Sequence, residues 1–497
     1  MGREAMGRHR HQRGTGRVSG RRLHALQNRA HSAIHHFLTV PLLVVCGFVL
    51  LAVGLYFLDA ALWSANTAPS DNLRWLGQAI GNSNALASLL GTLTTGLITV
   101  TSITFSLLLL AVQQGGSSYT NQVFDQFLRR RSNQLYLGYF VGLSIYTMLT
   151  MVSANAEHRP VFGTLFGIVL TALGLFLIIV LIYLTIIQSR PQLIVGAIRK
   201  SVLRSRQTQL ALLRSTRRNA SDGFSTVRRV RSRSQGYMTA IGMDRISDAA
   251  SEVRNSRRRA EAGDADFEIR FCLALGDYVA YADPLAEIRC RGSWLDEGDA
   301  DRIAADIIEA ITLKEQRDLD RDPALGLQQL ATIGWTSIST ASSNPAPGTL
   351  VCDAMRDILA RWVEDGPPPE DRSSEVVYSD VLNERAIAVL ESLMVVAHES
   401  LQHQSLAEIL RTFAMLIEDL PPVHADQVED IVLRSLSTLG EHVLTRSLED
   451  AINALVEALR ACGRDATADK LAEAADGLRQ SIGMLGSRST RVPSAGG

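Results

Sequence analysis

The chain has little cysteine and almost no lysine. Lysine occurs only at Lys200, Lys314 and Lys470, so arginine supplies nearly all of the positive charge. Among 497 residues, five are cysteine: Cys46, Cys272, Cys290, Cys352 and Cys462. So few cysteines in a chain of this length do not form a disulfide framework, and no two of them have CxxC spacing. A reducing compartment is therefore expected for the last four cysteines.

Common catalytic motifs are also missing. The chain has no G-x(4)-GK[ST] phosphate loop, no H-E-x-x-H, no G-x-S-x-G elbow and no dinucleotide glycine fingerprint. We therefore expect no catalytic residues, no cofactor and a protein that is not an enzyme.

Two clusters of candidate metal ligands have simpler interpretations. His31, His35 and His36 are expected to form a polar cluster at the membrane interface. The alternating acids of residues 318–322 lack the glycine and the distal glutamate of a calcium loop, so a solvated acidic turn is expected. No metal site is predicted.

Long apolar runs are absent after residue 187, but four occur before it. A helix needs about 20 apolar residues to cross a bilayer. The four runs are Leu38–Leu62, Ser88–Val112, Leu135–Val152 and Val161–Ile187. They predict a four-helix transmembrane domain over residues 38–187.

Charge is segregated along the chain. Residues 1–263 hold 30 Lys+Arg against 10 Asp+Glu, whereas residues 264–497 hold 20 against 41. Arginines crowd the arm of residues 1–37, the loop at 129–131 and the stretch after the fourth run, but the other two loops hold only Arg74 and Arg159. The positive-inside rule then places both termini in the cytoplasm of a plasma (inner) membrane protein. The basic flanks are expected to attract anionic lipid, and nucleic-acid binding is not expected because no groove-reading motif accompanies them.

The second apolar run carries hydroxyls at helical spacing. Steps of three and four residues place them on one helical face. The residues are Ser88, Thr92, Thr95, Thr99, Ser102 and Ser106, with Gln113 continuing the stripe. One interpretation is the lining of a water-filled pathway. The other is close helix packing, in which small hydroxyl side chains bond across helices or to their own backbone.

The remaining chain predicts a cytoplasmic α+β region. Its strands are expected at 236–241, 267–273 and 278–281, and helices at 299–316 and 376–403. The expected segments are a basic juxtamembrane helix and linker (188–233), a small β-barrel-like module (234–292), a helical segment (293–363), a linker (364–375), an acidic helical bundle (376–482) and a disordered tail (483–497). The spacing of turn and strand residues in this module is similar to that in the small barrels of biotinyl and lipoyl carrier domains. No lysine lies between Lys200 and Lys314, so carrier chemistry is excluded and only the barrel shape is expected.

Several stretches resemble a known family. They are GTLTTGLITVTSITFSLLLLAVQQ (91–114), FLRRRSNQLYLGYFVGLSIYTML (127–149), GDYVAYADPL (276–285) and RDLDRDPALGLQQL (317–330). Over roughly residues 38–360 the chain resembles a bacterial family of predicted membrane proteins, domain-of-unknown-function family 2254. That family usually continues to an N-D-P loop, and here Asn344-Pro345 lacks the acidic residue. The resemblance implies a membrane topology and carries no established activity.

Together these patterns predict an α-helical membrane protein with two open functional hypotheses. The first is a homo-oligomeric, channel-like or transport-related protein whose second span faces a shared axis in the lipid bilayer. The second is a membrane-anchored sensor or scaffold that binds a cytosolic protein partner. If the cytoplasmic region has a polar site, Arg317, Asp322, Gln329 and Asn344 are its candidates.

Overall fold

The computed structural model describes residues 39–61, 83–118, 131–154, 160–188, 190–259, 267–291, 295, 297–339 and 344–480. It divides the chain into two compact units, Met1–Ser189 and Arg190–Gly497. The expected basic arm with its three histidines, the disordered tail and the loops at 62–82 and 119–130 lie outside the described residues.

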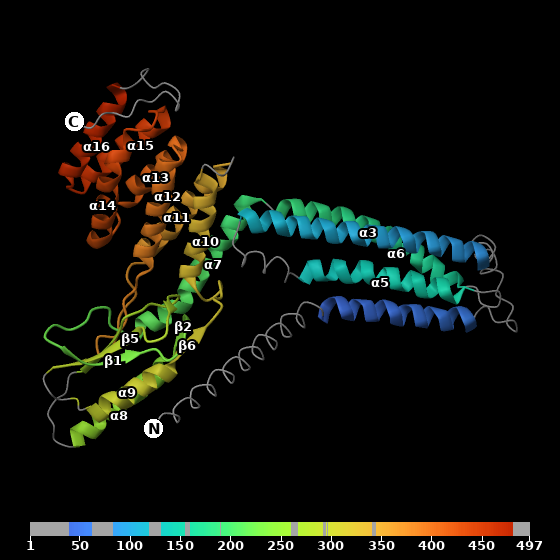
Figure 1. Cartoon of the computed structure of the whole chain (residues 1–497), viewed down its shortest axis with the longest axis horizontal. Coiled ribbons are helices and arrows are strands. Elements are labelled where there is room, and N and C mark those ends of the chain that lie inside the picture. The colour runs from blue at the N-terminus through green and yellow to red at the C-terminus, as the bar shows by residue number, and fades with distance from the viewer. Residues whose placement is uncertain are drawn as a thin grey trace, which may run out of the picture. The chain divides into compact units, whose positions relative to one another are not determined.

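The first unit contains the four candidate membrane-spanning helices (Figure 1). The described elements are a helix over Thr39–Ala61, α3 (Ser83–Ser118), α5 (Arg131–Ser153) and α6 (Val161–Gln188). In this part of the chain, four helices are long and apolar enough to cross a bilayer, with mean hydropathy from 1.5 to 3.1. The four predicted apolar runs are thus confirmed as helices that are candidates to span a membrane.

Close approach of helix backbones holds this unit together. A Cβ atom on Gly138 of α5 would lie 2.9 Å from the Cα of Pro41, and one on Gly142 would lie 2.5 Å from the ring of Phe48. Phe48 also meets Tyr139 edge-on, with ring centroids 5.4 Å apart. Small residues therefore allow the first helix and α5 to pack tightly, as is common between membrane helices.

The second unit contains two small β-sheets. Its strands are β1 (Ser225–Arg231), β2 (Gly236–Ile241), β3 (Phe267–Phe271), β4 (Tyr278–Val279), β5 (Pro284–Cys290), β6 (Ile311–Lys314) and β7 (Val376–Val377). One sheet has the order β1-β5-β3-β7 and the other β4-β2-β6, and only the β3–β7 pair is parallel. The described strands form no closed barrel, so the barrel-like shape is not confirmed.

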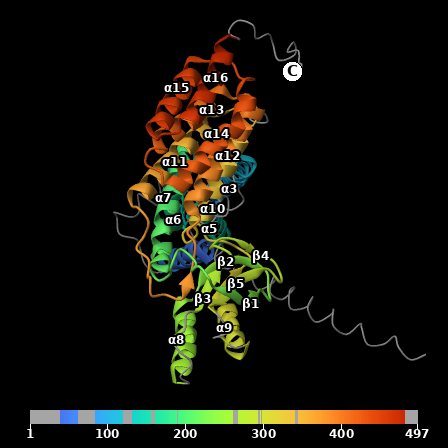
Figure 2. The ribbon, with the colours of Figure 1, turned by 90° about the vertical axis from the view of Figure 1, so that its left-hand side faces the viewer.

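Both sheets share one hydrophobic core with two helices. Helices α8 (Met243–Arg259) and α9 (Glu297–Ala310) pack side by side against this core (Figure 2). Met238 of β2, Ile269 of β3 and Ile288 of β5 are fully buried in it. The two sheets and two helices are therefore stabilised as one module.

The rest of the second unit is a helical bundle. Its helices are α7 (Pro191–Arg214), α10 (Pro323–Ile338), α11 (Ala346–Glu364), α12 (Leu382–Glu399), α13 (His403–Leu416), α14 (Pro422–Leu439), α15 (Arg446–Ala461) and α16 (Asp465–Gln480). Helix α15 shows why they associate: Leu448, Ile452, Leu455 and Leu459 form a buried stripe along one face. Helix α10 contacts α7, α11 and α12, so the bundle includes elements that precede residue 376.

Three predicted elements differ from the structure. The helix expected over 299–316 ends at Ala310, because residues 311–314 pair with β2 as β6. The helix expected from 376 starts at Leu382, because Val376–Val377 pairs with β3. The arginine-rich end of the expected linker forms β1 and pairs with β5. In each case long-range strand pairing overrides the local helical or loop pattern.

Candidate functional site

The hydroxyl stripe of α3 lies on an exposed face of the membrane unit. Its six serine and threonine residues are all exposed within the chain. The hydroxyls of Thr92, Thr95 and Thr99 donate to carbonyls four residues back, over 2.9 to 3.0 Å. Ser106 does the same with the carbonyl of Ser102 at 2.9 Å. A hydroxyl that donates in this way keeps its oxygen lone pairs as acceptors.

The opposite face of α3 makes its contacts within the chain. Leu86, Leu90, Leu97 and Thr104 are buried there. With 3.6 residues per turn, this row lies half a turn away from the hydroxyl stripe. Among the described residues of this unit, the stripe therefore lies away from the face of α3 that packs against other helices. Gln113 belongs to α3, but its side chain lies outside the described residues.

A buried carboxylate joins the first span to the last. Asp59 is fully buried and accepts the backbone N–H groups of Phe162 and Gly163 at 2.9 and 3.0 Å. These N–H groups are in the first turn of α6, where a helix has no internal acceptor for them. The carboxylate also lies at the positive end of the helix dipole. Asp59 is therefore a helix cap contributed by another helix, a role that sequence analysis did not identify.

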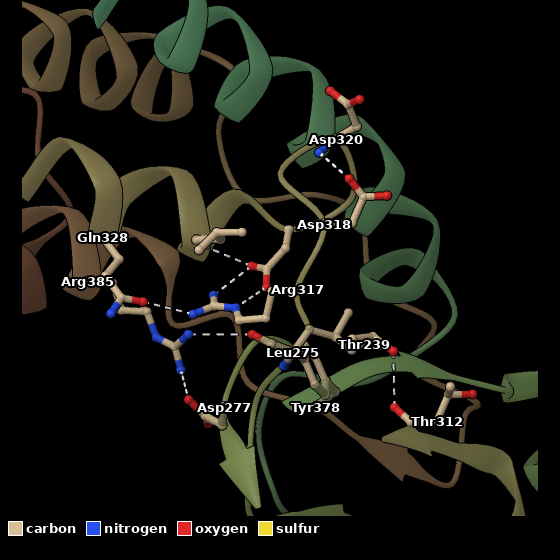
Figure 3. Close-up of polar contacts among 12 residues, drawn as sticks. Thr239, Leu275, Asp277, Thr312, Arg317, Asp318, Asp320, Gln328, Tyr378 and Arg385 are labelled. Atoms are coloured by element: carbon tan, nitrogen blue, oxygen red, sulfur yellow. Dashed lines mark hydrogen bonds and ion pairs between the residues drawn. The ribbon is translucent and has the colours of Figure 1, made fainter. Parts of the chain in front are cut away.

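In the second unit, Arg317 (Figure 3) forms a buried ion pair with Asp322. Arg317 donates from Nε and Nη2 to the two oxygens of Asp322, at 2.5 and 3.0 Å, and from Nη1 to Gln328 at 2.9 Å. Asp322 also accepts the N–H of Leu325 and so caps α10. The side chains of the pair are only 7% and 10% exposed. The bidentate geometry and the cap make this pair an anchor between β6 and α10.

The turn before β4 packs against that pair. Gly276 has a φ of +90°, and a Cβ atom there would lie 2.6 Å from Nη2 of Arg317. A side chain at this position would therefore displace the guanidinium. The neighbouring residue, Asp277, accepts from Arg385 of α12 at 2.5 Å (Figure 3). Two stretches that carry the family resemblance, 276–285 and 317–330, thus meet in space.

The buried side chain of Tyr378 belongs to the same cluster. The Tyr378 hydroxyl oxygen accepts the N–H of Leu275 at 2.8 Å, and Nη1 of Arg385 donates to the carbonyl of Leu275 (Figure 3). Burial raises the pKa of Tyr378 to about 12, so the phenol stays protonated at neutral pH. In this cluster, hydrogen bonds and ion pairs connect the β-sheet module to the helical bundle. This arrangement is consistent with a structural role.

The other candidates from this region lie apart. Gln329 is buried in α10, about two turns beyond Asp322. Asn344 is exposed beyond the other end of α10, where its Oδ1 accepts the N–H of Ala346. Since α10 has 16 residues, its ends are about 24 Å apart. The structure thus brings Arg317 and Asp322 together but leaves Asn344 at a different place.

The acidic turn is held by local hydrogen bonds. Asp318 accepts the N–H of Asp320 at 3.1 Å, and Asp320 accepts from the hydroxyl of Ser201 at 3.1 Å. Within the described ranges, no group of three or more His, Cys, Asp or Glu side chains is placed to hold a metal ion.

Three histidines form a cluster that the sequence did not reveal. Nδ1 of His398 lies 3.0 Å from Nε2 of His442, and Nδ1 of His403 lies 2.9 Å from Nδ1 of His442. His442 is fully buried. Burial lowers the pKa of His398 from 6.5 to about 4, so its ring is neutral at neutral pH. The turn between α12 and α13, with Leu401 at φ +50°, allows two histidines five residues apart to reach a third.

Comparison with known proteins gives one match. Residues 35–388, more than half of the chain, match the family described as "Predicted membrane protein (DUF2254)". No curated protein and no solved structure gives a significant match. The four spans and the Arg317–Asp322 pair fall within the matched residues, whereas the histidine cluster lies beyond them.

Proposed function

This chain belongs to the DUF2254 family of predicted membrane proteins, and we propose that it is a homo-oligomeric, channel-like or transport-related protein of the inner membrane. In this proposal, the hydroxyl face of α3 turns toward an axis shared by several copies. The termini and the unit of residues 190–497 lie in the cytoplasm, as the arginine distribution favours. The cytoplasmic unit regulates or assembles the pore and has no catalytic role.

One observation carries the proposal. The hydroxyl face of α3 lies opposite the row that packs within the chain, and it runs through the span from Ser88 to Ser106. A polar stripe that the chain does not use internally is available to another copy or to a water-filled pathway. Because the hydroxyls already donate to their own helix, the face offers oxygen acceptors, which suit water, small cations or polar solutes.

Cysteine reporters on α3 test this arrangement. In a chain whose five native cysteines are replaced by serine, Thr95→Cys and Thr99→Cys probe the hydroxyl face, and Leu97→Cys is the matched control on the packing face. We expect oxidation to link copies through positions 95 and 99 and not through 97. We also expect a water-soluble thiol reagent to block solute flux into liposomes only for the first two variants.

The opposite results have a clear meaning. If no variant crosslinks and the protein in liposomes passes no ion or small solute, the channel proposal is wrong. If a cytosolic protein is then captured and lost on deletion of 376–482, the membrane-anchored sensor or scaffold becomes the better hypothesis.

A further inference from the structure

A cavity of about 510 Å³ lies between α12 and α14 in the helical bundle. Each helix lines the cavity with residues at positions i, i+3, i+4 and i+7, a spacing that places them on one face of the helix. The lining includes Glu391, Met394, Val395 and His398 from α12, and Ile431 and Arg434 from α14. Helix α14 completes its face with Ser435 and Thr438, which are too small to fill the gap between the helices. This volume falls in the usual range of small-molecule sites.

The cavity combines an apolar floor with an acidic rim. Met394 and Ile431 are only 2% and 3% exposed. Glu391, Glu399 and Glu441 lie at its edge, against the single guanidinium of Arg434. That guanidinium is already shared with Asp430 and with Glu391. The lining therefore carries a net negative charge, which favours a cation with an apolar body.

His398 supplies a polar atom that needs a partner. The residue is 9% exposed, and its Nε2 is buried and makes no hydrogen bond within the described ranges. Its Nδ1 is occupied by His442. A buried polar atom without a partner is unfavourable, and His398 is one of the residues that line the cavity, so a ligand that enters the cavity is a candidate partner for this atom.

The histidine cluster is compatible with an acceptor role for this atom. If His398 donates its Nδ1–H to His442, then His442 donates from Nδ1 to His403, and every ring carries one N–H. In that arrangement Nε2 of His398 is a hydrogen-bond acceptor. An ammonium group can donate both to this nitrogen and to the carboxylates at the rim.

We propose that the cavity between α12 and α14 binds a small amphipathic organic cation, a protonated primary amine with an apolar body. The ammonium group donates to His398 and to a rim carboxylate, and the apolar body lies on Met394, Val395 and Ile431. The site lies C-terminal to the family match, and the proposal does not rest on conduction through α3.

Binding of phenethylamine tests the proposal directly. The full-length protein in lipid nanodiscs is titrated by calorimetry, with empty nanodiscs as the blank for membrane partitioning. We expect saturable binding, and binding at least about tenfold weaker for the neutral analogue 2-phenylethanol. No saturable heat up to about 10 mM phenethylamine, or equal affinity for the alcohol, overturns the proposal.

Variants separate the cavity from the rest of the surface. Thr438→Trp, at an exposed position, fills the cavity, Glu391→Gln removes a rim charge, and His398→Leu removes the acceptor. We expect each to weaken phenethylamine binding about tenfold or more, whereas the charge-matched control Glu457→Gln on exposed α15 surface leaves it unchanged. Unchanged affinity in Thr438→Trp, with helicity retained, also overturns the proposal.

Discussion

In the membrane unit, the hydroxyls on the exposed face of α3 bond to carbonyls one turn back in the same helix. In the unit of residues 190–497, arginines reach carboxylates far away in the sequence. Arg206 pairs with Asp380, and Arg385 with Asp277. Apolar surroundings leave little water to satisfy backbone or side-chain groups, so local bonding prevails in a span. In the unit of residues 190–497, a charged pair can join two distant elements because water at the edge of the pair partly solvates both charges.

Each unit nevertheless contains one buried carboxylate that caps a helix. Asp59 caps α6 from another helix, and Asp322 caps α10 from the residue before it. Their described contacts differ, since Asp322 pairs with the guanidinium of Arg317 and Asp59 accepts backbone N–H groups of α6.

Removal of Asp322 should have the largest effect. Asp322→Ala leaves a buried guanidinium unpaired and uncaps α10, so we expect the local free energy of unfolding to fall by about 4 kcal/mol. Hydrogen exchange of residues 311–338 measures the loss. The control is Asp430→Ala, which breaks a pair whose side chains are about 60% exposed and should change little. Equal effects of the two variants would contradict the buried-anchor interpretation.

Removal of Asp59 should come next. Asp59→Ala leaves two N–H groups of α6 without an acceptor in a dry environment, and we expect a loss of about 3 kcal/mol. Asp59→Asn keeps one acceptor oxygen and should lose roughly half as much. Far-UV circular dichroism during denaturation of the protein in nanodiscs measures both variants. Wild-type stability in Asp59→Ala would show that the cap is dispensable.

Acidification should weaken the helical bundle through His398. Its pKa in the folded state is about 4, below the unfolded value of 6.5, so the unfolded chain binds more protons between these values. This contribution to stability is complete above pH 6.5 and declines as pH falls toward 4. From pH 7 to pH 5 we expect a loss of about 2 kcal/mol. Hydrogen exchange in α12 and α13 measures it, and His398→Leu should flatten the pH dependence.

The smallest change in stability is expected for the hydroxyl stripe. Thr99→Val keeps the shape of the side chain and removes a hydroxyl that bonds only to its own helix, so the change should stay within about 0.5 kcal/mol. If α3 lines a pathway, solute flux should nevertheless fall, because a polar group is lost from the lining. A large loss of stability would instead assign the stripe to packing.

The sequence predicted correctly those features that depend on a local pattern of residues. The four spans were predicted because each helix needs a bilayer-length apolar run within itself. The strand over Gly236–Ile241 was predicted with the bounds of β2. Arg317 and Asp322 were also identified as candidates, five residues apart in the chain.

Features that depend on distant pairing were missed. The strand at Ile311–Lys314 extends a helical pattern and forms because β2 lies beside it. The histidine cluster was missed because His442 lies about 40 residues from the other two, and no spacing rule connects them. Asn344 was grouped with Asp322, although the length of α10 separates them.

The amino-acid sequence alone determined that this chain has four runs long and apolar enough to cross a membrane and that hydroxyls line one face of the second run. Both follow from periodicity and hydropathy within single helices, which need no knowledge of neighbours. Only the tertiary structure decided that this face points away from its own unit, that Asp59 caps α6, and that a neutral histidine lies in the wall of a cavity. These depend on which helices pack together, and packing is a property of the whole chain.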